Sequence, residues 1–174
     1  IKVEHIFKKR LLSNAEHDVM LKHFRCIAEA SKSDFVSLIM EDDATLCDGF
    51  NEKIELLKKE METKELLFLG YHMYEELREK VRDIYDCSSN NITIAPLNSE
   101  YYLGGIHCYS INTAGAEALV SYIEKNGIKN GIDYLMGTLN SEICYETRPQ
   151  LCFSAWDNGE GGPDLSKRVD SDIQ

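Results

Sequence analysis

An apolar run in this sequence leads directly into three consecutive carboxylates, and this junction limits the possible folds more than any other segment. Residues 35–40 are mostly apolar, and Glu41, Asp42 and Asp43 follow them without a break. Because turn-forming residues precede the run, the pattern predicts a buried strand over 35–40. Three adjacent carboxylates would repel one another strongly if they were desolvated and unpaired, so we expect a cation to compensate them.

A divalent metal ion is the simplest such cation, because Mg²⁺ and Mn²⁺ prefer carboxylate and water ligands. In open α/β sheets, ligands bind at the carboxyl ends of strands, and the triplet falls at such an end. An acidic, solvated loop after a core strand would produce the same pattern. The triplet alone therefore leaves both interpretations open.

The length and charge of the chain narrow the class of protein. Its 174 residues suffice for one domain with a core of its own. The formal net charge of -11 argues against a nucleic-acid partner, since nucleic-acid-binding surfaces need a basic stripe. No run approaches ~18 apolar residues, so we expect no transmembrane segment in this chain.

The pattern of cysteines indicates in which cellular compartment the protein is expected. Six are spread along the chain: Cys26, Cys47, Cys87, Cys108, Cys144 and Cys152. They form no CxxC pair and show no zinc-ligand spacing. Four lie in apolar runs, where we expect buried free thiols rather than disulfides. This pattern favours the cytoplasm, while a secretory lumen stays open as an alternative.

Helical periodicity predicts three helices. Ser13 and Glu16 form a capping box, and the helix that they open should run to about residue 30. Residues 48–49 can cap a second helix, whose charged face from Lys53 onward is interpreted as solvent-exposed. Thr113 is expected to cap a third helix.

Two histidines lie on the first predicted helix. His17 and His23 are six residues apart, so they would not share a face, and we do not expect a joint metal site. His23 alone is interpreted as a core histidine or as one that supports a neighbouring ligand.

The order of the predicted elements indicates an α/β fold. A strand over 35–40, a helix and a second buried strand over 66–70 indicate a βαβ unit and a parallel sheet. The pattern is weak over 71–98, as it often is in mobile substrate loops. Two short strands are expected within 144–153, and the polar tail from Ser154 is interpreted as a flexible terminus.

Two further places could contribute to a binding site. Gly104 and Gly105 precede a strand that contains His107, and such a pair permits positive φ and close approach of the backbone to a ligand. A β-bulge or a tight turn would also explain the glycines. Asp133 follows the turn at 130–131 and is either a helix N-cap or a carboxylate aimed into a cleft.

The order and spacing of these segments resemble glycosyltransferase family 25, the family of lipooligosaccharide and procollagen galactosyltransferases. No single motif is decisive, but together they span nearly the whole chain. The matching segments are Ser13 with Glu16, residues 21–23, 38–44, 104–109 and 115–116, Ile132-Asp133, residues 149–151 and residues 171–173.

The resemblance implies a GT-A fold, which is an α/β domain with a mixed, mostly parallel sheet flanked by helices. It also implies transfer of a hexose, galactose or glucose, from a UDP-sugar with inversion, usually with Mn²⁺ and otherwise with Mg²⁺. The acceptor would be a hydroxyl group of a glycan or of a hydroxylysine-type protein.

By the same resemblance, the acidic triplet is the metal and nucleotide motif. Asp43 would ligate the metal directly. Asp42 and Glu41 would act through water or the ribose, so that Asp42 would belong to both the metal site and the nucleotide site. Asp133 would be the base, with Asp157 as the next acid to consider.

The resemblance also assigns the diglycine segment. Gly104, Gly105 and His107 would line the cleft between the donor and the acceptor.

The chain departs from the family at three places. The family normally begins with an apolar strand, an Asn-Leu pair and an Arg that hold the uridine, and no such segment is found here. We therefore expect one domain over 1–174 in which the N-terminal nucleotide-binding strand is lacking or diverged. Gly131 replaces a usual proline, and Cys108 replaces a usual small alanine.

Two other functions fit parts of the pattern. A catalytically silent glycosyltransferase-like module could serve as a binding or scaffold part of a larger glycan-modifying protein. An α/β metal phosphohydrolase would release free phosphate and be indifferent to uridine, but it would lack an obvious nucleophile near Asp43.

Overall fold

The computed structural model describes residues 1–4, 11–73, 87, 91–100, 102–138 and 143–154. The predicted flexible tail after Ser154 lies outside these residues, and so does Asp157. Residues 74–86 and 88–90, which form most of the weakly patterned segment, also lie outside them.

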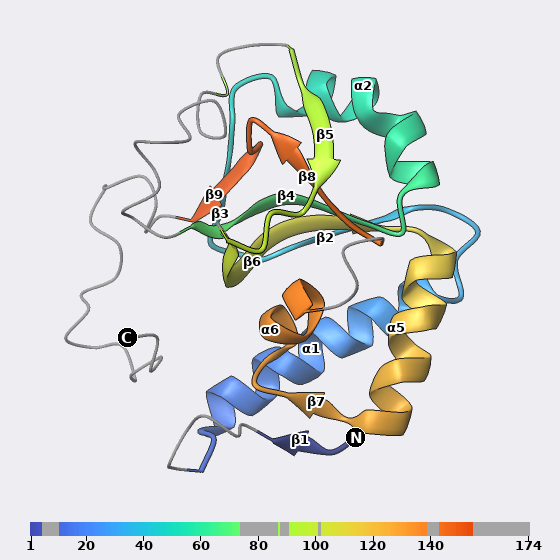
Figure 1. The fold of residues 1–174 in the computed structure, drawn as a ribbon, viewed down its shortest axis with the longest axis vertical. Helices are drawn as coiled ribbons and strands as arrows, with labels where there is room; N and C mark the ends of the chain where they lie inside the picture. Colours follow the sequence, from blue (N-terminus) through green and yellow to red (C-terminus); the bar gives the residue numbers. More distant parts are fainter. Residues whose placement is uncertain (5–10, 74–86, 88–90, 101, 139–142, 155–174) are drawn as a thin grey trace, which may run out of the picture.

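A five-stranded sheet forms the centre of the described structure, in the order β2-β6-β4-β8-β5 (Figure 1). Its strands are β2 (Ser37–Met40), β4 (Leu66–Met73), β5 (Thr93–Pro96), β6 (Tyr102–Ile111) and β8 (Cys144–Arg148). Only the β4–β8 pairing in this sheet is parallel, and the other three pairings are antiparallel. The mixed α/β class is confirmed, but the expectation of a mostly parallel sheet is wrong.

The sheet is not mostly parallel because the two strands of the predicted βαβ unit are not neighbours. Strands β2 and β4 do run in the same direction, because both are antiparallel to β6, but β6 lies between them. The helical connection from β2 to β4 therefore skips one position in the sheet. Strand β6, which comes later in the chain, occupies that position. As a result, the carboxyl ends of β2, β4 and β8 and the amino end of β6 lie at the same edge of the sheet.

Helices cover both faces of this sheet (Figure 1). One face packs against α1 (Asn14–Ala30), α5 (Thr113–Asn126) and α6 (Ile132–Thr138), around a core that includes Ile27, Phe68 and Tyr109. The other face packs against α2 (Phe50–Thr63) and a two-stranded sheet of β3 (Ala44–Leu46) and β9 (Cys152–Ser154). The short strands β1 (Val3–Glu4) and β7 (Ile128–Lys129) pair in parallel below α1 and α5.

Of two predicted helix N-caps, one is confirmed and the other is wrong. The capping box of α1 is confirmed, since the Glu16 N–H donates to Ser13 Oγ at 3.2 Å and the Ser13 N–H donates to Glu16 Oε2 at 2.7 Å. The predicted Thr113 cap of α5 is wrong. Asn112 caps this helix by accepting the Gly115 N–H at 2.8 Å, and the Thr113 hydroxyl donates to the Ser33 carbonyl instead.

Burial corrects two further predictions. Strand β2 is not buried, because it is an edge strand among the described residues, and Leu38 and Met40 are 39% and 42% exposed. Lys53 is not on a solvated face. It is 4% exposed, and its Nζ donates to the carbonyls of Asp48 at 2.7 Å and Cys87 at 2.8 Å.

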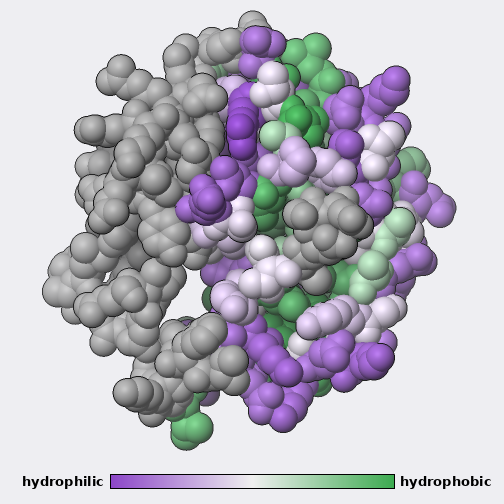
Figure 2. Space-filling model, in the orientation of Figure 1, coloured by the Kyte–Doolittle hydropathy of each residue, from purple (hydrophilic) through white to green (hydrophobic). Residues whose placement is uncertain are grey.

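The prediction of buried free thiols agrees with the structure. All six cysteines are free, and four of them are buried. Polar side chains make up much of the described surface in Figure 2, with smaller apolar areas between them. None of the helices in the described ranges is long and apolar enough to cross a membrane.

Candidate functional site

The acidic triplet forms the tight turn that connects β2 to β3. The Ala44 N–H donates to the Glu41 carbonyl at 3.3 Å, which closes a four-residue turn. Asp42 and Asp43 occupy its two central positions and are exposed. The Glu41 N–H still donates to the His107 carbonyl at 2.9 Å, so the β2–β6 ladder ends where the turn begins.

Glu41 differs from its two neighbours because its carboxylate faces two histidines. Its Oε1 lies 3.4 Å from His23 Nε2, and its Oε2 lies 3.9 Å from His107 Nδ1. The Nδ1 of His23 lies in turn 3.1 Å from the Tyr109 hydroxyl. Burial of the carboxylate by itself raises its pKa, but the facing rings of His107 and His23 outweigh that effect and lower the pKa of Glu41 to about 2.

This arrangement gives Glu41 a structural task. Its ionised carboxylate connects the end of β2 to helix α1 through His23 and to β6 through His107. The family resemblance expects Glu41 to act through water or the ribose. In the structure, its two oxygens face histidines, while the side chain is 32% exposed and lines the same cavity as Asp42 and Asp43.

A cavity of about 530 Å³ lies between the acidic turn and helix α1. Its helix side includes Lys22, His23 and Cys26, and its strand side includes all three acids of the triplet. A strand end with two exposed carboxylates beside a cavity of this size can accept a small ligand.

The donor set of the turn fits a metal ion that is shared with a ligand. Within the described residues, no group of three or more His, Cys, Asp or Glu side chains is arranged to hold a metal. Asp42 and Asp43 supply two hard carboxylates, and in the described part of the chain neither has a hydrogen-bond or ion-pair partner. Mg²⁺ is often bound in this way, by one or two carboxylates with substrate phosphates and water completing the shell.

Asp133 lies in the first turn of α6 and contacts the diglycine segment of β6. Its Oδ2 accepts the Gly105 N–H at 3.1 Å, and its Oδ1 accepts the Tyr134 N–H at 2.8 Å. The Tyr102 hydroxyl donates to the Asp133 carbonyl at 2.7 Å. Asp133 therefore lies inside α6, so the N-cap interpretation is wrong, and its carboxylate is held against β6.

Glycines make room for this carboxylate. A Cβ on Gly104 would lie 2.9 Å from Asp133 Oδ2, and a Cβ on Gly131 would lie 2.5 Å from Asp133 Oδ1. Both glycines have positive φ, +124° and +101°, which side chains rarely adopt. The pairing of β4 with β6 is also irregular here, as the bulge interpretation of the glycines predicted.

His72 belongs to this site but was not singled out from the sequence. It pairs with Gly104 across the β4–β6 ladder, and a Cβ on Gly105 would collide with its ring. Its ring meets the His107 ring edge to face, with centroids 4.4 Å apart. The sequence predicted a strand that ends at residue 70, whereas β4 continues to Met73. A longer predicted strand would have included His72 and placed it at the sheet edge that carries the acidic turn.

A single stretch of β6 connects the two groups of candidate residues. Gly104 and Gly105 contact Asp133, and His107 faces Glu41. Strand residues rise about 3.3 Å each, so these contacts are separated by about 7–10 Å along β6. The structure therefore brings the acidic turn and Asp133 to one edge of the sheet, although Gly104, Gly105 and Asp133 do not line the cavity beside α1.

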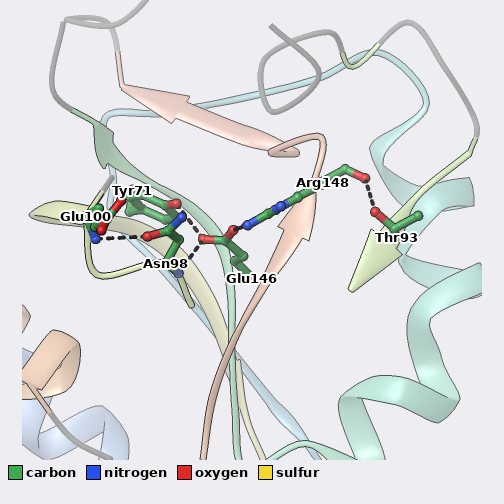
Figure 3. A network of polar contacts seen from close by, with 6 residues as sticks. All are labelled: Tyr71, Thr93, Asn98, Glu100, Glu146 and Arg148. Atoms are coloured by element: carbon green, nitrogen blue, oxygen red, sulfur yellow. Dashed lines mark hydrogen bonds and ion pairs between the residues drawn. The ribbon is translucent and has the colours of Figure 1, made fainter. Parts of the chain in front are cut away.

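A buried polar network supports the same edge from the side of β8 (Figure 3). Glu146 is fully buried and accepts hydrogen bonds from the Tyr71 hydroxyl at 2.5 Å and the Asn98 N–H at 3.3 Å. The Arg148 guanidinium donates to its other oxygen at 2.7 and 2.5 Å. The Tyr71 ring lies 5.2 Å from that of Tyr102, which holds Asp133, so the network helps to fix the position of α6.

Comparison with known proteins points in the same direction as the resemblance. No model of a known protein family matches the chain. The chain is similar to a protein of Acanthamoeba polyphaga mimivirus named "Putative glycosyltransferase", with 34% identity over 138 residues. The match covers 79% of this chain but 40% of the viral protein, so the matched region spans less than half the length of that relative. This similarity supports a glycosyltransferase family without distinguishing one such family from another.

Proposed function

We propose that this chain is part of a metal-dependent glycosyltransferase of the family 25 type, which moves galactose or glucose from a UDP-sugar to a hydroxyl acceptor with inversion. The acceptor would belong to a glycan or to a hydroxylysine-type protein. The similarity to the viral relative supports the reaction class. The observation that carries the proposal is the meeting of the acidic turn and Asp133 at one sheet edge, joined by β6.

Asp43 and Asp42 are the residues proposed to hold Mn²⁺ or Mg²⁺, because they are exposed carboxylates on a turn whose geometry is fixed. A metal ion bound there would neutralise charge on the departing UDP. Glu41 would keep the turn in place through His23 and His107 rather than touch the nucleotide.

Asp133 is the proposed base. It would take the proton from the acceptor hydroxyl while the acceptor oxygen bonds to the anomeric carbon. The bond from that carbon to the UDP oxygen breaks on the opposite side, and its electron pair leaves with UDP, so the configuration inverts. The N–H groups of Gly105 and Tyr134 orient the carboxylate, and its remaining lone pairs can accept the hydroxyl.

Binding and turnover can be tested with the same protein. Mn²⁺ and UDP together should raise the midpoint of thermal unfolding more than either alone, because both bind the folded state. Screening UDP-sugars for slow hydrolysis, with detection by mass, should then identify the transferred hexose. Absence of binding for UDP in the presence of Mn²⁺ would contradict the proposal.

A catalytically silent module is the second candidate function. The observation that favours it is that the described residues contain no group of three side chains arranged to hold a metal. Such a module would bind UDP or a glycan without hydrolysing any UDP-sugar. A phosphohydrolase, by contrast, would release inorganic phosphate from substrates that lack uridine.

A further inference from the structure

One edge of strand β2 pairs with no other strand in the described part of the chain. The Glu41 N–H donates to the His107 carbonyl of β6, and backbone groups alternate in direction along an antiparallel strand. The N–H and C=O of Ile39 therefore point toward β6, whereas those of Leu38 and Met40 point away from the sheet. Among the described residues, neither Leu38 nor Met40 has a backbone partner on that open side.

Cavities flank the open edge on both faces of the sheet. On the face of α2, a cavity of about 660 Å³ is lined by apolar side chains that include Val36, Leu38, Ile54 and Met61. On the face of α1, the cavity of about 530 Å³ includes Ile39 and ends at the acidic turn. Successive side chains of a strand point to opposite faces, so a strand beside β2 would place its side chains in the two cavities alternately.

The exposed side chains along this edge are apolar. Phe35, which lies two residues before β2, is 80% exposed, and Val19 of α1, which lines the α1-side cavity, is 45% exposed. Proteins usually protect an open edge with a charged side chain, a proline or a bulge. Strand β2 reads Ser-Leu-Ile-Met in regular register with β6, so it has none of these. An unprotected edge of this kind is suited to binding an extended segment of another polypeptide.

Charge indicates which kind of segment fits. The acidic turn follows the carboxyl end of β2, and Glu62 lines the α2-side cavity near the other end of the strand, where the Asn112 amide donates to its carbonyl at 3.2 Å. In the described part of the chain, the Glu62 carboxylate has no hydrogen-bond or ion-pair partner. Lys58 lines the same cavity, but its Nζ already donates to Glu55 at 2.6 Å. The edge is therefore flanked by negative charge, which complements basic residues.

A second copy of the chain does not meet this requirement. If two β2 strands paired in antiparallel, the acidic turn of each copy would lie beside Glu62 of the other. If they paired in parallel, the two acidic turns would lie together. Each chain also carries a formal net charge of -11, so like charges would repel in both arrangements.

We propose that the open edge of β2 binds an extended segment of a partner polypeptide and thereby gains a further strand. The segment is apolar over about the four residues of β2 and is flanked by Lys or Arg. A strand that ends level with Met40 fills the apolar part of the α1-side cavity and leaves the acidic turn uncovered. The inference concerns an interaction surface and does not depend on the proposed function.

The experiment uses a designed peptide as the probe. Fluorescence anisotropy in metal-free buffer would measure binding of acetyl-Lys-Lys-Val-Ile-Val-Val-Lys-Lys-amide to the whole chain. A peptide with Glu in place of every Lys should bind at least about tenfold more weakly, because it meets like charges. Two further peptides carry N-methyl groups on one or the other set of alternate core nitrogens. The peptide that loses the donors facing β2 should also bind at least about tenfold more weakly, whereas the other should bind normally.

Hydrogen exchange in the wild type locates the contact. When the peptide is at about ten times its dissociation constant, exchange of the Leu38 and Met40 amides should slow about tenfold, because most of the protein is bound. The Ile39 amide already points toward β6, so its exchange should change little. This measurement does not depend on whether a variant folds.

Matched variants test the same edge. Leu38→Lys places a charge on the edge and should weaken binding of the Lys-flanked peptide at least about tenfold. Leu56→Lys makes the same change at an exposed leucine of α2 that lines a different cavity, and it should stay within about twofold. Glu62→Gln should weaken binding about two- to fivefold, as expected for an exposed ion pair. Glu60→Gln, another exposed acid of α2, is its control.

Three outcomes would overturn the inference. The first is that the peptide leaves exchange of the Leu38 and Met40 amides unchanged. The second is equal binding of the Lys-flanked, Glu-flanked and both N-methylated peptides, which would mean that neither charge nor strand pairing selects the ligand. The third is that these two amides become protected without peptide as the protein concentration rises and the chain dimerises, which would make a second copy the occupant.

Discussion

Glu41 and His107 face each other across the last hydrogen bond of the β2–β6 ladder, with 3.9 Å between Oε2 and Nδ1. The same carboxylate faces His23 on α1, so one acid connects a strand end, a neighbouring strand and a helix. This contact fixes where the exposed turn of Asp42 and Asp43 begins.

The contact predicts a pH dependence of stability. The pKa of Glu41 is lowered from 4.5 to about 2, so its stabilising effect is complete above pH 4.5 and is lost as the pH falls toward 2. We therefore expect the difference in unfolding free energy between the wild type and Glu41→Gln to shrink as the pH falls from 4.5 toward 2. Urea unfolding at several pH values measures this difference, and a difference that does not change with pH would contradict the contact.

Asp43→Asn should abolish transfer without changing the fold. Asp43 is exposed and has no partner among the described residues, so the midpoint of thermal unfolding should stay within about 2 °C of the wild type. Asp34→Asn removes the same charge at the other end of β2 and should keep activity. Full transfer activity in Asp43→Asn would exclude Asp43 as the metal ligand.

Asp133→Asn should lower turnover more than donor binding. Loss of a general base typically costs about 10²–10⁴ in rate, whereas the KM for the UDP-sugar should change by less than about threefold. Steady-state kinetics separate the two quantities, and Asp18→Asn on the exposed face of α1 is the control. An unchanged rate would assign the base to another acid, such as Asp157.

Gly131→Ala should destabilise the protein more than Gly49→Ala. Both glycines have positive φ, so both variants incur backbone strain of about 1–3 kcal/mol. At Gly49 the nearest contact of an added Cβ is 3.6 Å, whereas at Gly131 the Cβ would lie 2.5 Å from the Asp133 carboxylate. Chemical unfolding of both variants compares them, and equal destabilisation would mean that the carboxylate moves aside at no cost.

Glu146→Gln should cost about 2–4 kcal/mol of unfolding free energy, because it leaves the Arg148 guanidinium without its charged partner next to the core. The exposed pair of Lys58 and Glu55 has a similar distance, 2.6 Å, but both side chains are 65% exposed. Glu55→Gln should therefore cost less than about 1 kcal/mol. Similar losses in the two variants would show that burial adds nothing to the Glu146 network.

Local signals predicted the helices well because each depends on residues close in sequence. Ser13 and Glu16 cap α1 as their spacing required, and the start of α2 after Gly49 was also anticipated. The Thr113 cap failed because Asn112, one residue earlier, has a side chain that accepts the Gly115 N–H. Boundaries of this kind are decided by a single hydrogen bond.

Strand order and burial were not predictable in the same way. An apolar run such as 35–40 looks alike in a central strand and in an edge strand, and only the position of β6 decides between them. Lys53 stands in a charged run, and its burial depends on the carbonyls of Asp48 and Cys87. Contacts between distant segments determine these features.

In the candidate site, too, some residues could be predicted from the sequence and others could not. The acids of the turn and Asp133 could be named from sequence because their residue types suggest their chemistry. His72 and Glu146 could not, since their importance comes from partners on other strands, Gly105 and His107 for one and Tyr71 and Arg148 for the other.

The insertion of β6 between β2 and β4 has a consequence for synthesis on the ribosome. A nascent chain that has reached residue 100 already contains the acidic turn and His72, yet the strand that binds β2 to β4 has not been made. Until Tyr102–Ile111 emerges, β2 and β4 lack the strand that pairs with both of them. Their unpaired edges can meanwhile form wrong pairings. Translation past this segment is therefore the first point at which β2, β6 and β4 can pair, whereas Asp133 and strand β8 are added later.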